Sequence, residues 1–239
     1  MGPRPEMTSQ ARTGSREAAP KPAEGVGVPP VLRDAGLVFW DFDGVVKDSV
    51  EVKSDGFRWI VRGAGDLIGD RVQQHHETNG GITRFEKIPL YLSWAGMSSD
   101  AAAVRRACAE FSRFVVDAVV DSPWVPGVRN YLVENRGNQV FILVTATPAD
   151  EIEWILDRLG LSPCFSEVHG APIAKTDAVS QTLAHHRFEP DKSVFIGDSE
   201  SDHRAATKNN VPFLLRRHRL NGYLVEALDV PSFGGLTNG

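Results

Sequence analysis

Four short apolar runs recur along the chain, with helical patterns between them. A continuous apolar run bounded by polar residues is typical of a strand that is buried on both faces of a parallel sheet. Because such strands alternate with helical segments, the pattern predicts an α/β fold with a parallel sheet. The expected strands are Leu37–Trp40, Val140–Val144, Val194–Ile196 and Val211–Leu215.

The interval from Ser49 to Ser122 has helical periodicity and almost no strand signal. Between Ala101 and Val120, apolar side chains recur at three- and four-residue spacings, which indicates an amphipathic helix. Because this interval separates the first two expected strands, residues 49–122 are interpreted as a helical cap inserted into the sheet domain. Two prolines and a glycine mark the exit from the cap, and a helix is expected to begin at Pro126.

Residues 31–48 and 123–220 together form the expected core, a Rossmann-like parallel sheet with covering helices. Thr147 is a suitable N-cap for one of these helices, with Pro148 at its first position and acidic residues in its first turn. The expected core helices are Val128–Glu134, Pro148–Leu159, Thr176–Phe188 and Asp202–Asn210.

Two terminal segments stand outside this organisation. Residues 1–30 have almost no large apolar side chains, so they cannot bury enough surface to offset the entropy of ordering, and a disordered leader is predicted. Residues 221–239 form a C-terminal tail with too little pattern for an assignment.

Composition narrows the class of protein. The chain has 239 residues, of which 41% are hydrophobic, and a net charge of −5 without a dense block of Lys and Arg, so nucleic acid is not an expected partner. No apolar stretch approaches a membrane span, and the N-terminal segment lacks the apolar centre of a signal peptide. We therefore expect a cytoplasmic protein with no membrane partner. Cys108 and Cys164 suit small reduced side chains.

Candidate chemistry begins at Asp41 and Asp43, which follow the first strand directly. In an extended chain, residues at i and i+2 project to the same side, and ligands of parallel sheets bind outside the carboxyl ends of the strands. The pair therefore suits a carboxylate that meets a phosphorus atom beside one that reaches the leaving oxygen. The alternative is a solvated turn at the strand end.

Polar side chains follow the other strands as well. The hydroxyl of Thr145 and backbone amides such as that of Ala146 could bind phosphate oxygens, or form a plain turn. Lys175 stands at a helix start, where a cation favours an anionic partner, although a solvated lysine is the alternative. Asp198 and Asp202 would supply hard oxygen ligands for Mg²⁺. Asp202 also fits a capping box with Ser199 and could simply cap its helix.

In this order the motifs resemble those of the haloacid dehalogenase superfamily, and the helical insert resembles the cap of its phosphoglycolate phosphatase and β-phosphoglucomutase branch. The resemblance covers Leu37 to Leu215. It implies that Asp41 is a nucleophile and Asp43 a general acid/base. It implies further that Thr145, Ala146 and Lys175 bind phosphate, and that Mg²⁺ is held by Asp41, Asp198 and the Asp43 carbonyl, with support from Asp202.

The expected activity is Mg²⁺-dependent hydrolysis of a small organic phosphomonoester, such as a sugar, polyol or small-acid phosphate, through an aspartyl-phosphate intermediate. The alternatives are a phosphomutase, a phosphonate hydrolase that uses Lys53 or Lys87 of the insert, and a non-catalytic binding protein. Dehalogenation is disfavoured because the resembling dehalogenases do not need a second aspartate such as Asp43.

The polar segment from His75 to Lys87 is the expected specificity element of the cap. Arg84 and Lys87 share a face if a helix begins at Thr83, whose side chain could form a capping box with Glu86. Lys47, just downstream of the acidic pair, is a further candidate for substrate contact. His75 and His76 are expected to be structural, because no cluster of other metal ligands accompanies them in the sequence.

Overall fold

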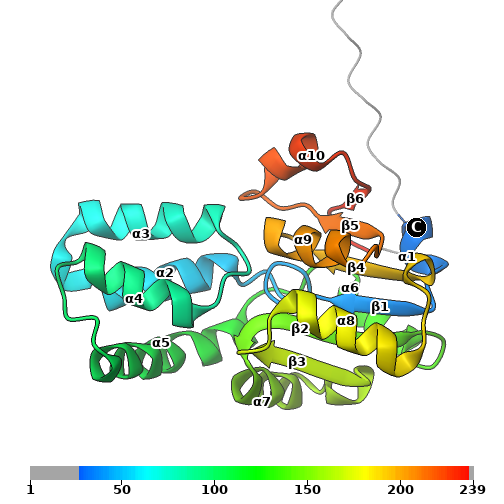
Figure 1. Cartoon of the computed structure of the whole chain (residues 1–239), viewed down its shortest axis with the longest axis horizontal. Helices are drawn as coiled ribbons and strands as arrows, with labels where there is room; N and C mark the ends of the chain where they lie inside the picture. Colours follow the sequence, from blue (N-terminus) through cyan, green and yellow to red (C-terminus); the bar gives the residue numbers. More distant parts are fainter. Residues whose placement is uncertain (1–26, 237–239) are drawn as a thin grey trace, which may run out of the picture.

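The computed structural model describes residues 27–236, and its centre is a six-stranded parallel sheet with the order β3-β2-β1-β4-β5-β6 (Figure 1). The first 26 residues of the predicted leader lie outside this range, and a short helix, α1 (Pro30–Arg33), precedes the first strand. The predicted α/β fold class is confirmed. The strands are β1 (Leu37–Trp40), β2 (Val140–Pro148), β3 (Glu167–Ala171), β4 (Ser193–Gly197), β5 (Phe213–Arg216) and β6 (Ser232–Phe233).

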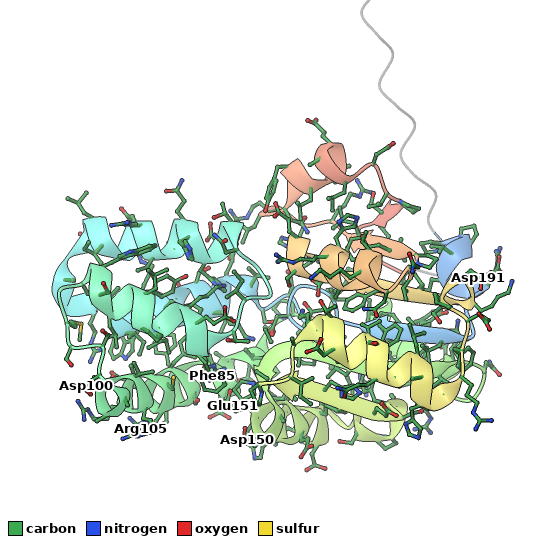
Figure 2. The ribbon with its side chains drawn as sticks, in the orientation of Figure 1. Phe85, Asp100, Arg105, Asp150, Glu151 and Asp191 are labelled. Atoms are coloured by element: carbon green, nitrogen blue, oxygen red, sulfur yellow. The ribbon has the colours of Figure 1, made fainter. Side chains whose placement is uncertain are left out.

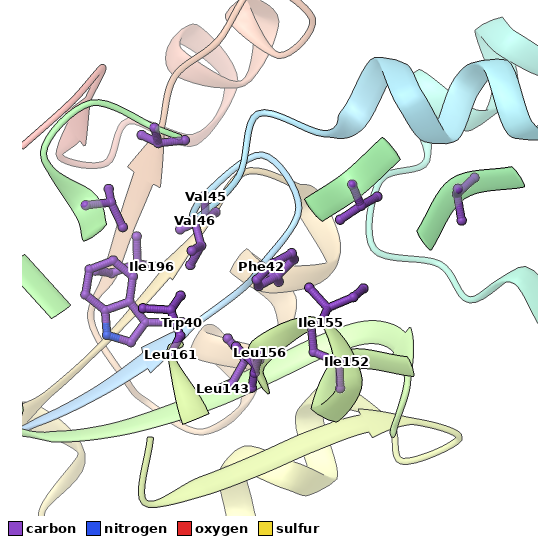
Figure 3. Close-up of a cluster of buried hydrophobic side chains, with 14 of the residues drawn as sticks. Trp40, Phe42, Val45, Val46, Leu143, Ile152, Ile155, Leu156, Leu161 and Ile196 are labelled. Carbon is purple, nitrogen blue, oxygen red and sulfur yellow. The ribbon is translucent and has the colours of Figure 1, made fainter. Parts of the chain in front are cut away.

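Alternate side chains of the central strands enter two different apolar clusters. Trp40 of β1 packs on Phe141 and Tyr131 on one face of the sheet, whereas Phe39 stacks on Phe195 on the other. Figure 3 shows part of the first cluster, between the central strands and a covering helix. Both faces are therefore dry, which is why these strands read as unbroken apolar runs. The core helices are α6 (Val128–Asn135), α7 (Ala149–Leu159), α8 (Lys175–His186), α9 (Glu200–Lys208) and α10 (Gly222–Leu228).

The cap is a group of four helices at the left of Figure 1, beyond the end of the sheet. Phe57 lies at its centre, with ring centroids 4.3 Å from Phe111 and 5.2 Å from Tyr91. The stripe predicted between Ala101 and Val120 forms one long helix, and its buried positions recur every four residues. The cap helices are α2 (Val50–Ile60), α3 (Asp66–Thr78), α4 (Arg84–Trp94) and α5 (Ala101–Asp121).

The sequence analysis did not predict two of the strands, β3 and β6. The β3 sequence, Glu-Val-His-Gly-Ala, has no apolar run because the strand lies at one edge of the sheet and three of its side chains are only partly buried. The β6 strand has two residues and belongs to the segment that was set aside as a tail. That segment in fact adds α10 and β6 to the core, and Leu224 and Phe233 are buried.

Two predicted helix starts are corrected by the backbone. β2 continues through Thr147 to Pro148, so α7 begins at Ala149 and Pro148 is its N-cap residue in place of Thr147. α6 begins at Val128 instead of Pro126, because Gly127 takes a left-handed conformation with φ of 77° just before it.

Cys108 and Cys164 are free thiols. Among the described helices, none is both long and apolar enough to cross a membrane.

Candidate active site

Three neighbouring strands place polar side chains at their carboxyl ends, on the same end of the sheet. Asp41 follows β1, Thr145 lies near the end of β2, and Asp198 follows β4, and β1 pairs with both of its neighbours in parallel. Carboxyl ends of parallel strands meet at one edge, so these residues share one pocket beneath the cap. The sheet domain contributes Asp41, Asp43, Thr145, Ala146, Lys175 and Asp198 to this pocket, and the cap contributes Val50, Lys53, Phe57, His76, Glu77, Arg84 and Phe111.

Asp41, Lys175 and Asp202 form a buried chain of charges. The Lys175 Nζ lies 2.9 Å from Asp41 Oδ1 and 2.6 Å from Asp202 Oδ1. Burial and the neighbouring acids raise the pKa of Asp41 well above its ordinary value, although Lys175 opposes this effect. Burial alone would lower the pKa of Lys175, but the two carboxylates raise it, so the lysine remains a cation. The anionic partner expected for a lysine at this helix start is therefore Asp41 together with Asp202.

Asp43 is held by three donors. Ser49 donates to Oδ1 at 2.7 Å, Thr147 donates to Oδ2 at 3.1 Å, and Lys53 of α2 forms an ion pair with Oδ2. Lys53 also donates to Thr147 at 2.7 Å. Burial favours the protonated acid, but the charge of Lys53 and these hydrogen bonds outweigh it and lower the pKa of Asp43. In this arrangement Asp43 is an ionised base, attached to the cap through Lys53.

Asp198 is fixed by a loop near the C-terminus. The Nε2 of His218 lies 2.9 Å from Asp198 Oδ2, and the Asn221 side chain donates to the Asp198 carbonyl at 2.8 Å. The space beside this carboxylate requires a glycine at position 44: a Cβ there would lie 2.0 Å from Asp198 Oδ2, and φ is +79°. The Gly that follows the acidic pair is thus explained by close approach as well as by turn geometry.

The donor set fits a hard divalent cation. Asp41, Asp198 and Asp202 each offer a carboxylate oxygen within 4.8 Å of the others. Asp202 is already committed, because Oδ1 accepts from Lys175 and Oδ2 accepts from the Ser199 backbone at 3.1 Å and hydroxyl at 2.6 Å. The capping interaction predicted for Asp202 is therefore present together with its bond to Lys175. Oxygen ligands and an excess of buried carboxylates are the conditions that Mg²⁺ prefers.

The predicted specificity residues of the cap lie in different surroundings. Arg84 lines the pocket and pairs with Glu151 of α7 at 2.7 Å, so it joins the cap to the core. Lys87 is 1% exposed, and its Nζ lies 2.9 Å from His76 Nδ1. His76 itself lines the pocket, while Lys87 stands behind it. Figure 2 marks this junction by Glu151 and Phe85, the neighbour of Arg84.

Lys47 does not line the pocket, contrary to the expectation that it touches the substrate. Its Nζ donates to the Val120 carbonyl at 2.9 Å and lies 4.2 Å from the centre of the Trp124 ring, so it anchors the exit of the cap. Sequence reasoning also missed Thr147, His218 and Asn221 as neighbours of the acids. Thr147 was expected only as a helix N-cap, and Asn221 lies in the tail that showed no pattern. The contacts of these side chains and of His218 with the acids are made between segments that are far apart in the sequence.

Comparison with known proteins shows the family to which the chain belongs. A family model described as haloacid dehalogenase-like hydrolase matches residues 38–207, which is most of the chain. The chain therefore belongs to the haloacid dehalogenase-like hydrolase family and is an enzyme, as its motifs predicted. No curated protein matches the sequence significantly.

Solved structures with the same fold include proteins whose names fall in the branch that the helical insert resembles. A predicted phosphoglycolate phosphatase from Haemophilus somnus has a TM-score of 0.65 at 16% identity, covering 83% of this chain and 94% of its own. The β-phosphoglucomutase of Clostridium difficile also has a TM-score of 0.65 at 16% identity, with coverage of 84% and 92%. A subfamily IA hydrolase from Geobacter sulfurreducens gives 0.53 at 19% identity, with coverage of 82% and 97%. At these identities the likeness concerns the fold.

Proposed function

We propose that this enzyme is a Mg²⁺-dependent phosphatase that hydrolyses a small organic phosphomonoester. The observation that carries the proposal is the Asp41 carboxylate, which lies 2.9 Å from Lys175 in a pocket shared with Thr145 and Asp198. Phosphoryl transfer depends on positioning and on charge neutralisation, and this pocket supplies a buried anion beside a fixed cation. Asp41 attacks the phosphorus atom, and its bond to phosphorus replaces the bond to the leaving oxygen.

The other residues divide the remaining work. Lys175, Thr145 and the amide of Ala146 bind the phosphoryl oxygens, and Asp202 holds Lys175 in place. Asp41, Asp198 and the Asp43 carbonyl would hold Mg²⁺, which supplies charge neutralisation when bound. Asp43 protonates the leaving oxygen and then takes a proton from the water that hydrolyses the aspartyl phosphate. The lowered pKa of Asp43 suits the second of these roles, and the first requires its bond to Lys53 to loosen.

The substrate is proposed to be a phosphorylated sugar, polyol or small acid, because the pocket is closed by cap side chains and carries both polar and aromatic groups. Retention of both aspartates, the lysine and Asp198 argues against a non-catalytic binding protein. Lys53 is engaged by Asp43, and Lys87 lies behind His76 and does not line the pocket, which disfavours phosphonate cleavage through a lysine amine.

A chromogenic phosphate ester tests the class of reaction. We expect turnover with Mg²⁺, loss of turnover in excess chelator, and recovery when Mg²⁺ is restored. Asp198→Ala should weaken Mg²⁺ binding and lower kcat/KM together, by about 10²–10³-fold, because it removes a proposed ligand and the carboxylate that contacts His218. Full activity in chelator would exclude the proposed use of the cation. A panel of phosphorylated metabolites would then identify the substrate.

A further inference from the structure

A second cluster of ligand-type side chains lies outside the pocket, between the edge strand β3 and the last turn of α8. Its centre is the Glu167 carboxylate. The His185 Nδ1 lies 2.7 Å and the His186 Nε2 2.9 Å from Oε1, while the His169 Nε2 lies 2.8 Å from Oε2. Three imidazoles therefore converge on one carboxylate.

The convergence of His185 and His186 is unusual for a helix. Consecutive residues of an α-helix point about 100° apart, so they do not normally meet at one point. Here the helix ends at His186, and Arg187 takes a left-handed conformation with φ of 56°. Both rings reach Glu167 Oε1, and the three potential ligand atoms lie within 4.8 Å of one another. The arrangement places two nitrogens and one oxygen around a common point.

The position on the helix favours a cation. The carboxyl end of a helix carries partial negative charge, so a carboxylate there is disfavoured and a cation is stabilised. The Glu167 carboxylate lies beside this helix end and meets three imidazole nitrogens and the Thr182 hydroxyl, so polar atoms that could hold a cation converge there.

The surroundings resemble those of a metal ligand in two respects. Glu167 Oε2 is held by His169 and by the Thr182 hydroxyl at 3.1 Å, so the carboxylate is oriented by groups other than His185 and His186. Such outer hydrogen bonds fix first ligands in metal sites. The His185 side chain is 74% exposed, so an ion and its water ligands have access from solvent.

The contacts to Oε1 go beyond what the orientation of Glu167 requires. Each carboxylate oxygen can accept two hydrogen bonds, but His169 and Thr182 on Oε2 already fix the position of the carboxylate. A plain helix end would favour a single basic side chain near its last carbonyls. Two adjacent histidines on one oxygen are better explained by a shared ligand.

We propose that Glu167, His185 and His186 form a binding site for a borderline transition-metal ion, Zn²⁺ above all, in which water completes the coordination. Two imidazole nitrogens and one carboxylate oxygen are a donor set that Zn²⁺ accepts, whereas Mg²⁺ prefers oxygen ligands alone. The site joins β3 to α8, the helix that begins at Lys175. Its role is structural, because it lies outside the pocket.

Calorimetric titration of the full chain with Zn²⁺, in buffer containing millimolar Mg²⁺ to occupy the acidic pocket, tests this site. We expect one Zn²⁺ bound with a Kd of micromolar order and a rise in Tm of a few degrees. Glu167→Gln and His186→Ala should each weaken the binding at least about tenfold. His169→Ala, which removes an orienting bond but no ligand, should weaken it less than either of these two variants does. His203→Ala, which alters a histidine of α9, should leave it unchanged.

Substitution by Co²⁺ gives a readout that does not depend on activity or on stability. We expect visible absorption bands of a cobalt ion with nitrogen ligands in the parent chain and their loss in Glu167→Gln and His186→Ala, with circular dichroism to verify folding. Absence of binding, or equal binding in all variants, would overturn the proposal. Equal loss in Asp198→Ala would assign the ion to the pocket and would overturn it as well.

Discussion

The pocket has one wall from the core and one from the cap, and the two differ in how their buried charged groups are compensated. In the core wall, made of Asp41, Lys175, Asp198 and Asp202, the Lys175 cation lies between the carboxylates of Asp41 and Asp202, and the His218 ring contacts Asp198. On the cap wall, Lys53 and Arg84 line the pocket and each pairs with a carboxylate of the core, Asp43 and Glu151. His76 also lines the pocket, and Lys87 lies behind it. The nitrogen of Lys87 contacts His76, and no described carboxylate lies within ion-pair distance of it.

The pKa values of Lys175 and Lys87 are shifted in opposite directions. Two carboxylates raise the pKa of Lys175, whereas burial, assisted by the charge of Lys53, lowers the pKa of Lys87 to about 7. Burial and Lys87 likewise hold the pKa of His76 well below its ordinary value, so this ring is neutral. The core wall is therefore preorganised for one common group, while the cap wall retains electrostatic cost that a ligand could relieve.

The largest expected effect concerns the core wall. Asp41→Asn keeps the volume of the side chain but removes the attacking charge, so kcat on a chromogenic ester should fall by at least about 10⁴-fold. Circular dichroism should show an unchanged fold, and the exposed Asp34→Asn should keep full activity. Substantial turnover by the folded Asp41→Asn protein, after deamidation has been excluded, would remove Asp41 from its proposed role.

Replacement of Lys87 tests the cost in the cap wall. The folded pKa of about 7 lies below that of an unfolded lysine, so the folded state binds fewer protons and stability should rise with pH between these two values. Below pH 7 the penalty is fully present. Lys87→Met should therefore raise the free energy of unfolding by about 2–4 kcal/mol at pH 6, and the gain should shrink as pH increases.

Denaturant unfolding at a series of pH values measures this effect, with the exposed Lys192→Met as the matched control, for which no change is expected. A loss of stability at pH 6 would mean that Lys87 is compensated by a group that its surroundings do not reveal. Because stability and function often oppose each other, we also expect Lys87→Met to alter the ranking of substrates.

Arg84 tests a cap cation that is paired with a carboxylate of the core, as Lys53 is with Asp43. Arg84→Ala removes the contact with Glu151 and the hydrogen bond to Ser112 at 2.8 Å, which leaves the partly buried Glu151 carboxylate without its cation, although the Ser112 hydroxyl still donates to it. We expect a loss in kcat/KM for the preferred substrate of about 1–3 kcal/mol and a smaller loss on a small generic ester. Arg105→Ala, exposed on α5, is the control. An unchanged ranking across a metabolite panel would exclude Arg84 from specificity.

The smallest expected effect concerns the close contact between the cap loop at Gly81 and helix α9 of the core. Gly81 has φ of +71°, and a Cβ there would lie 1.9 Å from the Ser201 Oγ of α9. Gly81→Ala should lower kcat/KM about 5–10-fold, because the cap loop must retreat from the core. Gly96→Ala shares the positive φ but meets nothing within 4 Å, so it should leave kcat/KM unchanged. Addition of Ser201→Ala should restore part of the loss; equal effects of both glycine changes would contradict the idea.

Much of the core could be predicted because its information is local. Buried parallel strands are apolar on both faces, so Leu37–Trp40 and Val194–Ile196 stand out in any window of the chain. The acids follow these strands immediately, and the carboxyl ends of parallel strands must meet at one edge. The sequence therefore predicts that Asp41 and Asp198 lie at the same end of the sheet. The structure shows that β1 and β4 are neighbours and that both acids line the pocket.

The pairing of charges in the cap wall, and the gathering of histidines around Glu167, could not be predicted because both depend on tertiary contacts. Whether Lys47 or Lys53 reaches the pocket is decided by the path of the turn into α2, which no residue pattern encodes, and the structure selects Lys53. The edge strand β3 carries Glu167 and His169 and shows no apolar run, so its meeting with His185 and His186 could not be anticipated. Charge compensation in particular is a property of distances across the fold, because electrostatic energy depends on which groups are neighbours and on how much water separates them.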